Sequence, residues 1–421
     1  MTGAVIADVS IRAPRSGLGV EVCLDFPPTG QTVYLPLPDR KLLDAVRIKA
    51  GTYLERVVPL AARLRAGTEP AARALRVLLN AGSELTALLV QEDRARFLRV
   101  QEAFRDAWPV WDRAGWDDPA APLPVVQMSC LDDTLPLELL PVFDFGTLPE
   151  PRTYDDLVRA AARFLGFTAV VRRVIPAGRS GDRVLRNEPA LPVQFFRHRK
   201  LPSARREARF LASLAGHVRV EGPWPVSQDR AAVRAVLLQA LYDGGCLDGS
   251  APTDPPVQVQ HFACHCNTTA ALDDDYTIRL STRSGRRREI SFGELRQAYR
   301  ERLFAHDDHG RHRAVIVLNA CGSSRTNPLT AFSFARWFVR SGHRAFIGTE
   351  TDVPDGVAGG FAAAFYGRLL ESRRPLGEAV TWARRDLLRD FRNPLGLLYV
   401  MYGDTDLVVE QARPGIYRTM A

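Results

Sequence analysis

The residues of this chain best suited to covalent chemistry are a thiol and an imidazole, each at the end of an apolar run. Cys321 comes just after the run at residues 314–318, and His265 ends a run at residues 257–265. A thiol becomes a nucleophilic thiolate near neutral pH when a base or cation stands beside it, and histidine commonly supplies that base. The pair therefore predicts a cysteine nucleophile served by a histidine.

Both runs are typical of strands buried in a parallel sheet. Residues 314–318 are apolar without a break, rich in Val, and followed closely by the turn residue Gly322. The segment between the two runs has room for a hairpin and one crossover helix before the next parallel strand. Reacting groups of open α/β sheets collect at the carboxyl ends of the strands, so we expect thiol and imidazole to meet there. Backbone N–H groups near Gly322 could also hold a developing oxyanion.

Other roles for the same residues stay open. His261 is an alternative base, because residues 261 and 265 of one strand point to one face. We prefer His265 because it lies nearer the carboxyl end. His261, Cys264, His265 and Cys266 also suggest zinc ligation, but alternating side chains cannot all converge on one ion, and no Cys-x-x-Cys partner occurs in the chain. We therefore expect no metal.

The chain shows few signs of other catalytic classes. Ser323 or Ser324 could in principle serve a serine triad, but the chain has no Gly-x-Ser-x-Gly elbow. It also has no Gly-x-x-x-x-Gly-Lys phosphate loop, which argues against nucleotide chemistry. No cofactor is expected.

The composition indicates which partners and which cellular location to expect. The net charge is +8, and nearly all basic residues are scattered arginines, a pattern we attribute mainly to the codon bias of a GC-rich genome. Nucleic-acid binding through an arginine surface is the less favoured alternative. The six cysteines lack disulfide-framework spacing, and we see neither a signal peptide nor an apolar run of membrane-spanning length. These features predict reduced thiols, a cytoplasmic location and no membrane partner.

The patterning divides the chain into two parts. Alternating runs in residues 4–36 predict strands, a helical zone follows over 39–111, and residues 116–122 form a linker-like turn. We therefore predict a smaller α+β region over residues 1–120, regulatory or partner-binding, and a second domain over 121–421. Strands and helices alternate in the second half, which predicts an α/β fold with a mixed, mainly parallel sheet and helices on both faces.

Two acidic residues follow the next strand after Cys321. Glu350 and Asp352 come after the predicted strand at residues 344–348, so their loop would line the same sheet edge and could touch a substrate. The more ordinary alternative is a pair of solvated loop acids.

Several motifs together resemble the CHAT domain, a caspase-like branch of the clan that also holds separases. The two that carry chemistry are His261-Phe262-Ala263-Cys264-His265 and Leu318-Asn319-Ala320-Cys321. Further matching segments lie at residues 135–140 (a Pro-x-Glu-Leu-Leu pattern), 346–349, 361–370, 379–388 and 402–404. The resemblance covers roughly residues 120–410 and implies a caspase-like sheet.

The resemblance also implies roles. His265 would be the general base and Cys321 the nucleophile of peptide-bond cleavage through a thioester. Backbone N–H groups of Cys266 and Cys321 would hold the oxyanion. Three positions depart from the family pattern: Cys266 replaces a usual Gly, Glu350-Thr351 replace a usual aromatic, and Asn319 stands where several relatives carry Asp. The last two leave the substrate preference open, including an acidic pocket for a basic residue before the cut.

We therefore expect a bacterial, intracellular cysteine endopeptidase that cleaves a protein partner. The family implies a role in antiphage defence, conflict or programmed cell death, with an effector encoded nearby as substrate. The chain shows no sensor repeats, so a separate activator or sensor protein, or residues 1–120, would switch it on. The rival hypothesis is an inactive caspase-like scaffold, whose cellular function would survive Cys321→Ala and His265→Ala.

Overall fold

The structure is a computed structural model. It describes residues 3–13, 19–109, 116, 118, 121–129, 135–140, 151–175, 182–187, 189–225, 230–248, 250, 255–268, 276–281, 287–304, 314–320 and 334–410. The predicted nucleophile, Cys321, and the alternative nucleophiles Ser323 and Ser324 lie outside these residues.

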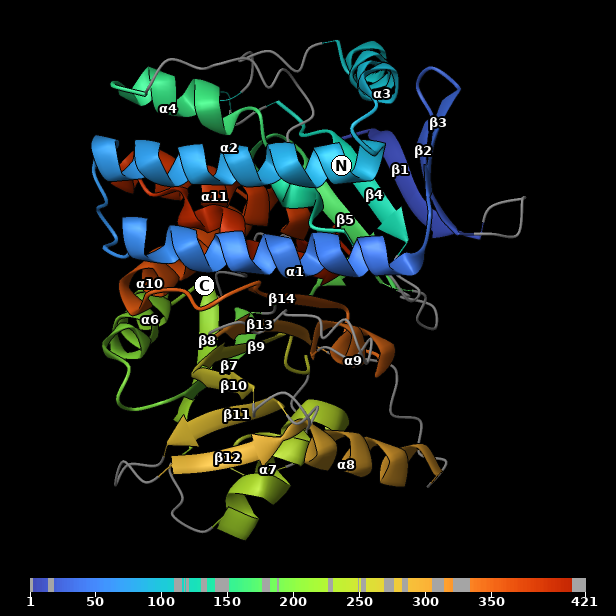
Figure 1. Ribbon diagram of the computed structural model, residues 1–421. Helices are drawn as coiled ribbons and strands as arrows, with labels where there is room; N and C mark the ends of the chain where they lie inside the picture. Colours follow the sequence, from blue (N-terminus) through green and yellow to red (C-terminus); the bar gives the residue numbers. More distant parts are fainter. Residues whose placement is uncertain are drawn as a thin grey trace, which may run out of the picture.

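One 11-stranded sheet runs through the molecule, as Figure 1 shows. Its order is β3 (Gln31–Leu37), β2 (Val20–Phe26), β1 (Val5–Arg12), β4 (Val125–Ser129), β5 (Val170–Val174), β15 (Tyr399–Gly403), β14 (Ala345–Thr349), β13 (Val315–Asn319), β9 (Val259–Ala263), β7 (Leu191–Arg197) and β8 (Val218–Trp224). Most neighbours are parallel, while β1, β2 and β3 pair antiparallel and β14 pairs antiparallel with β15. The predicted mixed, mainly parallel sheet is therefore confirmed.

The central strands are buried on both faces, as the apolar run of β13 predicts. Every residue of β9, β13 and β14 is buried. Helices cover both faces of this part of the sheet. On one face, His261 contacts α6 (Pro202–Ser213) and α10 (Asp355–Tyr366). On the other face, Gln260 donates to a carbonyl of α7 (Arg230–Asp243), and Phe346 stacks on α9 (Phe334–Arg340).

The first residues of the chain join the same sheet as the later ones. Strand β1 pairs in parallel with β4, with Val9 opposite Met128, and so extends the sheet across the predicted boundary at residue 120. Helices α1 (Arg40–Val57) and α2 (Thr68–Val90) pack side by side along one side of the molecule (Figure 1), followed by α3 (Arg94–Ala107). The helical zone is thus confirmed, and the division into two domains stays a prediction.

A second, three-stranded sheet follows β9. It consists of β10 (His265–Thr268), β11 (Tyr276–Ser281) and β12 (Arg287–Ser291), and α7 and α8 (Phe292–Phe304) pack near it, as Figure 1 shows. The single strand predicted over residues 257–265 is wrong in this respect. Strand β9 ends at Ala263, whose carbonyl accepts a hydrogen bond from the backbone N–H of His198, and the chain turns at Cys264 into the second sheet.

The remaining elements complete the helical layers. Helix α4 (Tyr154–Ala161) begins at a capping box formed by Thr153 and Asp156. The others are α5 (Leu165–Thr168), α11 (Leu376–Phe391), the short strands β6 (Val184–Leu185) and β16 (Val408–Val409), and the short helices η1 (Val58–Ala61), η2 (Leu137–Leu139), η3 (Gly367–Glu371) and η4 (Pro394–Leu398). No helix in the described ranges has the length and apolar character that a membrane crossing requires.

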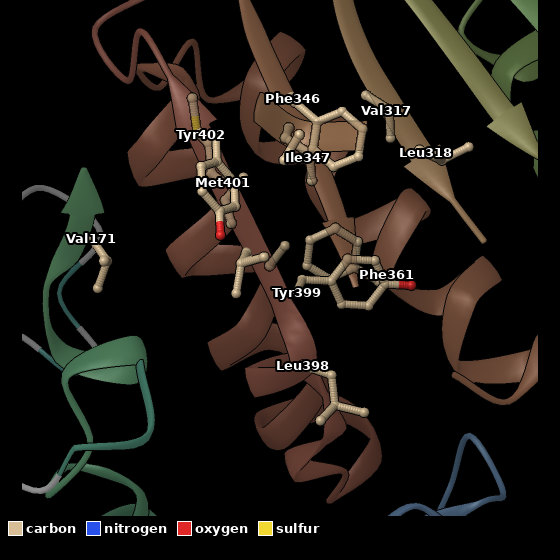
Figure 2. Close-up of a cluster of buried hydrophobic side chains, with 14 of the residues drawn as sticks. Val171, Val317, Leu318, Phe346, Ile347, Phe361, Leu398, Tyr399, Met401 and Tyr402 are labelled. Carbon is tan, nitrogen blue, oxygen red and sulfur yellow. The ribbon is translucent and has the colours of Figure 1, made fainter. Parts of the chain in front are cut away.

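The core continues across the antiparallel step between β14 and β15. Figure 2 shows apolar side chains from β13, β14 and β15 gathered against α10. The rings of Phe361 and Tyr399 lie parallel, with centroids 3.5 Å apart. This packing holds α10 against the sheet close to the carboxyl end of β13.

Candidate active site

The strands that precede the two predicted catalytic residues are parallel neighbours. In the register of β9 and β13, Ala263 lies opposite Asn319. Both strands end there, so the chain leaves the same sheet edge toward His265 and toward Cys321. The adjacency of these strand ends, predicted from the two apolar runs, is confirmed.

His265 is the first residue of β10 and is partly exposed. Its ring packs edge-to-face against His198, with centroids 4.8 Å apart and planes at 69°. His198 directly follows β7, the other neighbour of β9, and is buried. Three adjacent strands, β7, β9 and β13, thus lead to His198, to His265 and to the segment that begins with Ala320.

The second sheet presents two different faces beside His265. On one face, His265 of β10, Arg279 of β11 and Glu289 of β12 lie side by side across the three strands. Arg279 and Glu289 form an ion pair, with 2.9 Å between Nε and Oε1. The neighbouring row contains Cys266, Ile278 and Ile290, all buried. The face that carries His265 is therefore polar, while the side chain of Cys266 belongs to the core.

The residue before Cys321 is held by the next strand. Ala320 accepts a hydrogen bond of 2.7 Å at its carbonyl from the hydroxyl of Thr349, the last residue of β14. The backbone N–H of Ala320 donates to the carbonyl of Leu318 in a tight turn. Because β14 is the parallel neighbour of β13, this hydroxyl reaches straight to the turn that leads into Cys321.

The two predicted substrate acids follow β14 at the same edge. Glu350 is partly exposed, and its backbone N–H donates to the carbonyl of Leu398. Asp352 is exposed. Their place beyond β14 puts them on the loop next to the end of β13, and their contact with a substrate stays a prediction.

His261, the alternative base, lies inside the core. Its Nε2 is 2.6 Å from Oε2 of Glu207, its Nδ1 is 3.0 Å from the hydroxyl of Tyr366, and its ring stacks on Phe195. Burial, together with the charge of Glu207, raises the pKa of Tyr366 well above its ordinary value of 10. Tyr366 therefore keeps its proton. Both ring nitrogens of His261 are engaged within the protein.

The same carboxylate also binds the strand that leads to Cys321. Asn319 donates from Nδ2 to Oε2 of Glu207 and to the carbonyl of Ala358, each at 3.0 Å. Its Oδ1 accepts a hydrogen bond of 2.6 Å from the hydroxyl of Tyr399. Asn319 is thus fully used in holding β13 against α6, α10 and β15.

A possible cation site among the described residues lies away from these strand ends. Glu221, Cys246 and Asp248 bring one potential ligand atom each within 4.8 Å of one another. The carboxylate of Glu221 already accepts from the side chain of Gln194 and from the backbone N–H of Leu247. Glu221 thus links β8 to the loop after α7, and these bonds account for its position without an ion.

Comparison with known proteins assigns the family. The model of the CHAT domain matches residues 150–412, which is more than half of the chain. This chain belongs to the CHAT domain family. The recognition of a CHAT domain from the sequence motifs is therefore confirmed, and both strand ends described above lie within the matched residues.

Individual relatives resemble parts of this CHAT protein. A probable protease of Vitiosangium sp. is 33% identical over 124 residues, which cover 28% of this chain and 16% of that protein. The chain thus matches only about a sixth of the length of that relative. Two crystal structures of the separase–securin complex of Saccharomyces cerevisiae align over 96% and 97% of this chain and 30% of theirs, at 11% and 10% identity with TM-scores of 0.41 and 0.44. These low scores add nothing to the assignment.

Several residues around the CHAT strand ends escaped the sequence analysis. His198 follows an apolar run, as His265 does, so the same criterion would have found it. Thr349 lies within a matched motif but was not singled out. Glu207 has no comparable signal, because an acid within the arginine-rich segment of α6 is typical of a solvated helix face.

Proposed function

We propose that this protein is a cysteine endopeptidase that uses His265 and Cys321. The observation that supports it best is the parallel pairing of β9 with β13, which brings the chain leading to both residues to one sheet edge. Membership of the CHAT family and the protease name of the Vitiosangium relative point the same way.

The proposed reaction uses groups of this chain alone. His265 takes the proton of the Cys321 thiol, and the thiolate sulfur attacks the carbonyl carbon of the substrate peptide. Backbone N–H groups of Cys266 and Cys321 stabilise the oxyanion. The amine leaves with the proton from His265, and water then hydrolyses the thioester, which returns the thiol.

The substrate is proposed to be a protein partner, an effector encoded nearby in a bacterial antiphage, conflict or cell-death system. Glu350 and Asp352 would favour a basic residue next to the cut, because their loop carries two carboxylates at this edge. A separate activator or sensor, or residues 1–120, would control the enzyme.

The test combines labelling and cleavage. The purified full chain is treated with a thiol-reactive activity probe, the labelled residue is identified by mass spectrometry, and candidate neighbouring proteins are screened for cleavage. We expect labelling at Cys321, no cleavage by Cys321→Ala, and a rate about 10²- to 10⁴-fold lower for His265→Ala.

A matched thiol provides the control. Cys246 is a buried cysteine that has no part in the proposed reaction, and Cys246→Ala should label and cleave like the wild type. Cleavage by Cys321→Ala at the wild-type rate would exclude the proposed nucleophile. Cellular function that survives both Cys321→Ala and His265→Ala would support the scaffold hypothesis instead.

A further inference from the structure

A single buried carboxylate bonds to both strands that lead to the predicted catalytic residues. Glu207 lies on α6 with only 2% of its surface exposed. Its Oε2 is 2.6 Å from Nε2 of His261 on β9 and 3.0 Å from Nδ2 of Asn319 on β13. One oxygen atom therefore ties together the two strands whose relative position sets the distance between the proposed base and the proposed nucleophile.

The two bonded residues lie on the same face of the sheet and close to its edge. His261 is opposite Val317, and Asn319 is opposite Ala263, so both side chains project toward α6. Each stands only a few residues before the proposed catalytic residue of its own segment. A shift of either strand along its axis would lengthen one of the two bonds to Glu207.

Helix α6, which carries Glu207, is bonded to α10. At the start of α6, the backbone N–H of Ser203 donates to Oδ2 of Asp355 at 2.8 Å, and the hydroxyl of Ser203 donates to the other oxygen of that carboxylate. The partners of Glu207 are anchored to α10 as well: Tyr366 bonds to His261, and the carbonyl of Ala358 accepts from Asn319. Helices α6 and α10 thus form a common frame for β9 and β13.

We propose that Glu207 is a positioning residue. It fixes how far β9 and β13 are shifted along their axes relative to each other, and so the distance between His265 and Cys321, which follow these strands. The inference rests on the proposed cysteine peptidase function and goes beyond it, because Glu207 touches neither proposed catalytic residue in the described contacts. Reacting atoms must come within about 3–3.5 Å, and a misplacement of about 1 Å can reduce the rate about 100-fold. A hydrogen-bonded buried carboxylate resists such shifts, because leaving its donors unpaired costs about 1–3 kcal/mol each.

The test compares Glu207→Met with Glu138→Met, a change at a carboxylate of equal burial. Glutamine could keep both bonds of Glu207 through its carbonyl oxygen, whereas methionine keeps the length of the side chain and removes the acceptor. Glu138→Met removes a carboxylate that is equally buried but bonded to arginines of β5 and α11, and not to β9 or β13 in the described contacts. For each variant, the rate constant of Cys321 alkylation and the kcat and KM of cleavage are measured and divided by the folded fraction from circular dichroism.

We expect Glu207→Met to lower kcat and the alkylation rate about tenfold or more, with little change in KM, and Glu138→Met to leave both rates per folded molecule unchanged. A milder variant guards against misfolding. Tyr399→Phe keeps the ring that stacks on Phe361 and removes only the hydroxyl that bonds to Asn319. It should lower the same rates by a smaller factor.

The outcomes separate the two proposals. If Cys321 labels in a His265-dependent manner and both Glu207→Met and Tyr399→Phe react at the wild-type rate, the positioning role is wrong and the peptidase proposal stands. If Glu138→Met slows the chemistry per folded molecule as much as Glu207→Met does, the effect is general to buried acids and the positioning role is also wrong. If Cys321 is not the labelled residue, the peptidase proposal itself is wrong.

Discussion

Two buried glutamates in different parts of the molecule bind different partners: Glu138 binds arginines, and Glu207 binds a histidine and an asparagine. Glu138, on η2, is 1% exposed and receives Nη1 of Arg173 at 2.5 Å and Nη2 of Arg384 at 3.4 Å on Oε1, while its Oε2 receives Nη2 of Arg173. Glu207, on α6, is 2% exposed and receives only an imidazole and an amide among the described residues, both on Oε2. The first site joins a carboxylate to two guanidinium groups, and the second joins a carboxylate to an imidazole and an amide.

The electrostatics of the Glu138 site show what the arginines do. Burial by itself would raise the pKa of Glu138, but the charges of Arg173 and Arg384 outweigh it, so that the pKa lies below its ordinary value of 4.5. Burial lowers the pKa of Arg384 to about 10, although Glu138 acts against that shift. The cluster is therefore ionised throughout the neutral range and links η2, β5 and α11.

The difference between Glu138 and Glu207 shows that burial alone does not tell whether an acid acts on stability or on a site. Around Glu138, compensating charges join η2, β5 and α11, which are far apart in the sequence. Around Glu207, an imidazole from β9 and an amide from β13 meet at the edge where chemistry is proposed. We therefore expect changes at Glu138 to act on stability and changes near Glu207 to act on reactivity.

The largest expected effect on stability is that of Glu138→Ala. The variant leaves Arg173 and Arg384 buried without their carboxylate, and breaking a buried ion pair from one side typically costs about 3–5 kcal/mol. Chemical denaturation should show this loss in the free energy of unfolding. Alkylation of Cys321 per folded molecule should stay unchanged, and a parallel fall in both quantities would contradict the contrast between the two sites.

Acid should weaken the Glu138 site in a predictable direction. The folded-state pKa of Glu138 is lowered, so its ionised form stabilises the fold above the ordinary value of 4.5. That contribution is lost as the pH falls below 4.5 through the folded-state pKa. The difference in unfolding free energy between wild type and Glu138→Gln, measured from pH 7 to pH 3, should therefore shrink toward low pH. A constant difference would show that the charge of Glu138 contributes nothing.

Two glycines allow the packing at the two sites to be compared. A Cβ at Gly166 would lie 2.5 Å from Cδ1 of Leu397 and 2.7 Å from Cβ of Glu138. A Cβ at Gly359 would meet Cβ of Ser203 at 3.4 Å and Cγ of Glu207 at 4.0 Å, which are ordinary contacts. We expect Gly166→Ala to lower the unfolding free energy by about 1–3 kcal/mol.

Gly359→Ala should be neutral or slightly stabilising, because alanine in a helix is favoured over glycine by up to about 1 kcal/mol. Thermal unfolding of the two variants side by side provides the measurement. Equal losses at both positions would mean that the frame around Glu207 is as tightly packed as the surroundings of Glu138.

A small expected loss of stability accompanies a selective effect on rate at Thr349. Thr349→Val keeps the shape of the side chain and removes the hydroxyl that donates to the carbonyl of Ala320. The loss of this bond should lower stability by about 1 kcal/mol. Because Ala320 precedes Cys321, kcat should fall several-fold at nearly constant KM. Thr381→Val, which removes another buried hydroxyl that donates to backbone carbonyls, is the matched control and should leave kcat unchanged.

Much of the architecture was predictable from local patterns. The unbroken apolar run before Cys321 and the strand-like run before Cys264 predicted buried strands, because short runs rich in Val that end at a turn favour a sheet interior. The alternation of strands and helices predicted the α/β fold, and the crossover length predicted that β9 and β13 run in parallel. The motif order was enough to recognise the CHAT family.

Other features depend on contacts between distant segments. The break at Cys264, which turns the chain from β9 into β10, follows from pairing with β11 and from the hydrogen bond between His198 and Ala263, neither of which a local pattern encodes. The joining of β1 to β4 was hidden for the same reason.

What the sequence by itself determined is therefore the set of buried strands and the places of the thiol and imidazole that follow them, because periodicity and residue type are local properties. What only the tertiary structure decided is which partners the buried polar side chains hydrogen-bond to. His261 looked like a possible base until α6 and α10 bound both its ring nitrogens. Glu207 looked like a surface acid until the fold placed it between two strands, since hydrogen-bond partners are chosen by proximity in space and not along the chain.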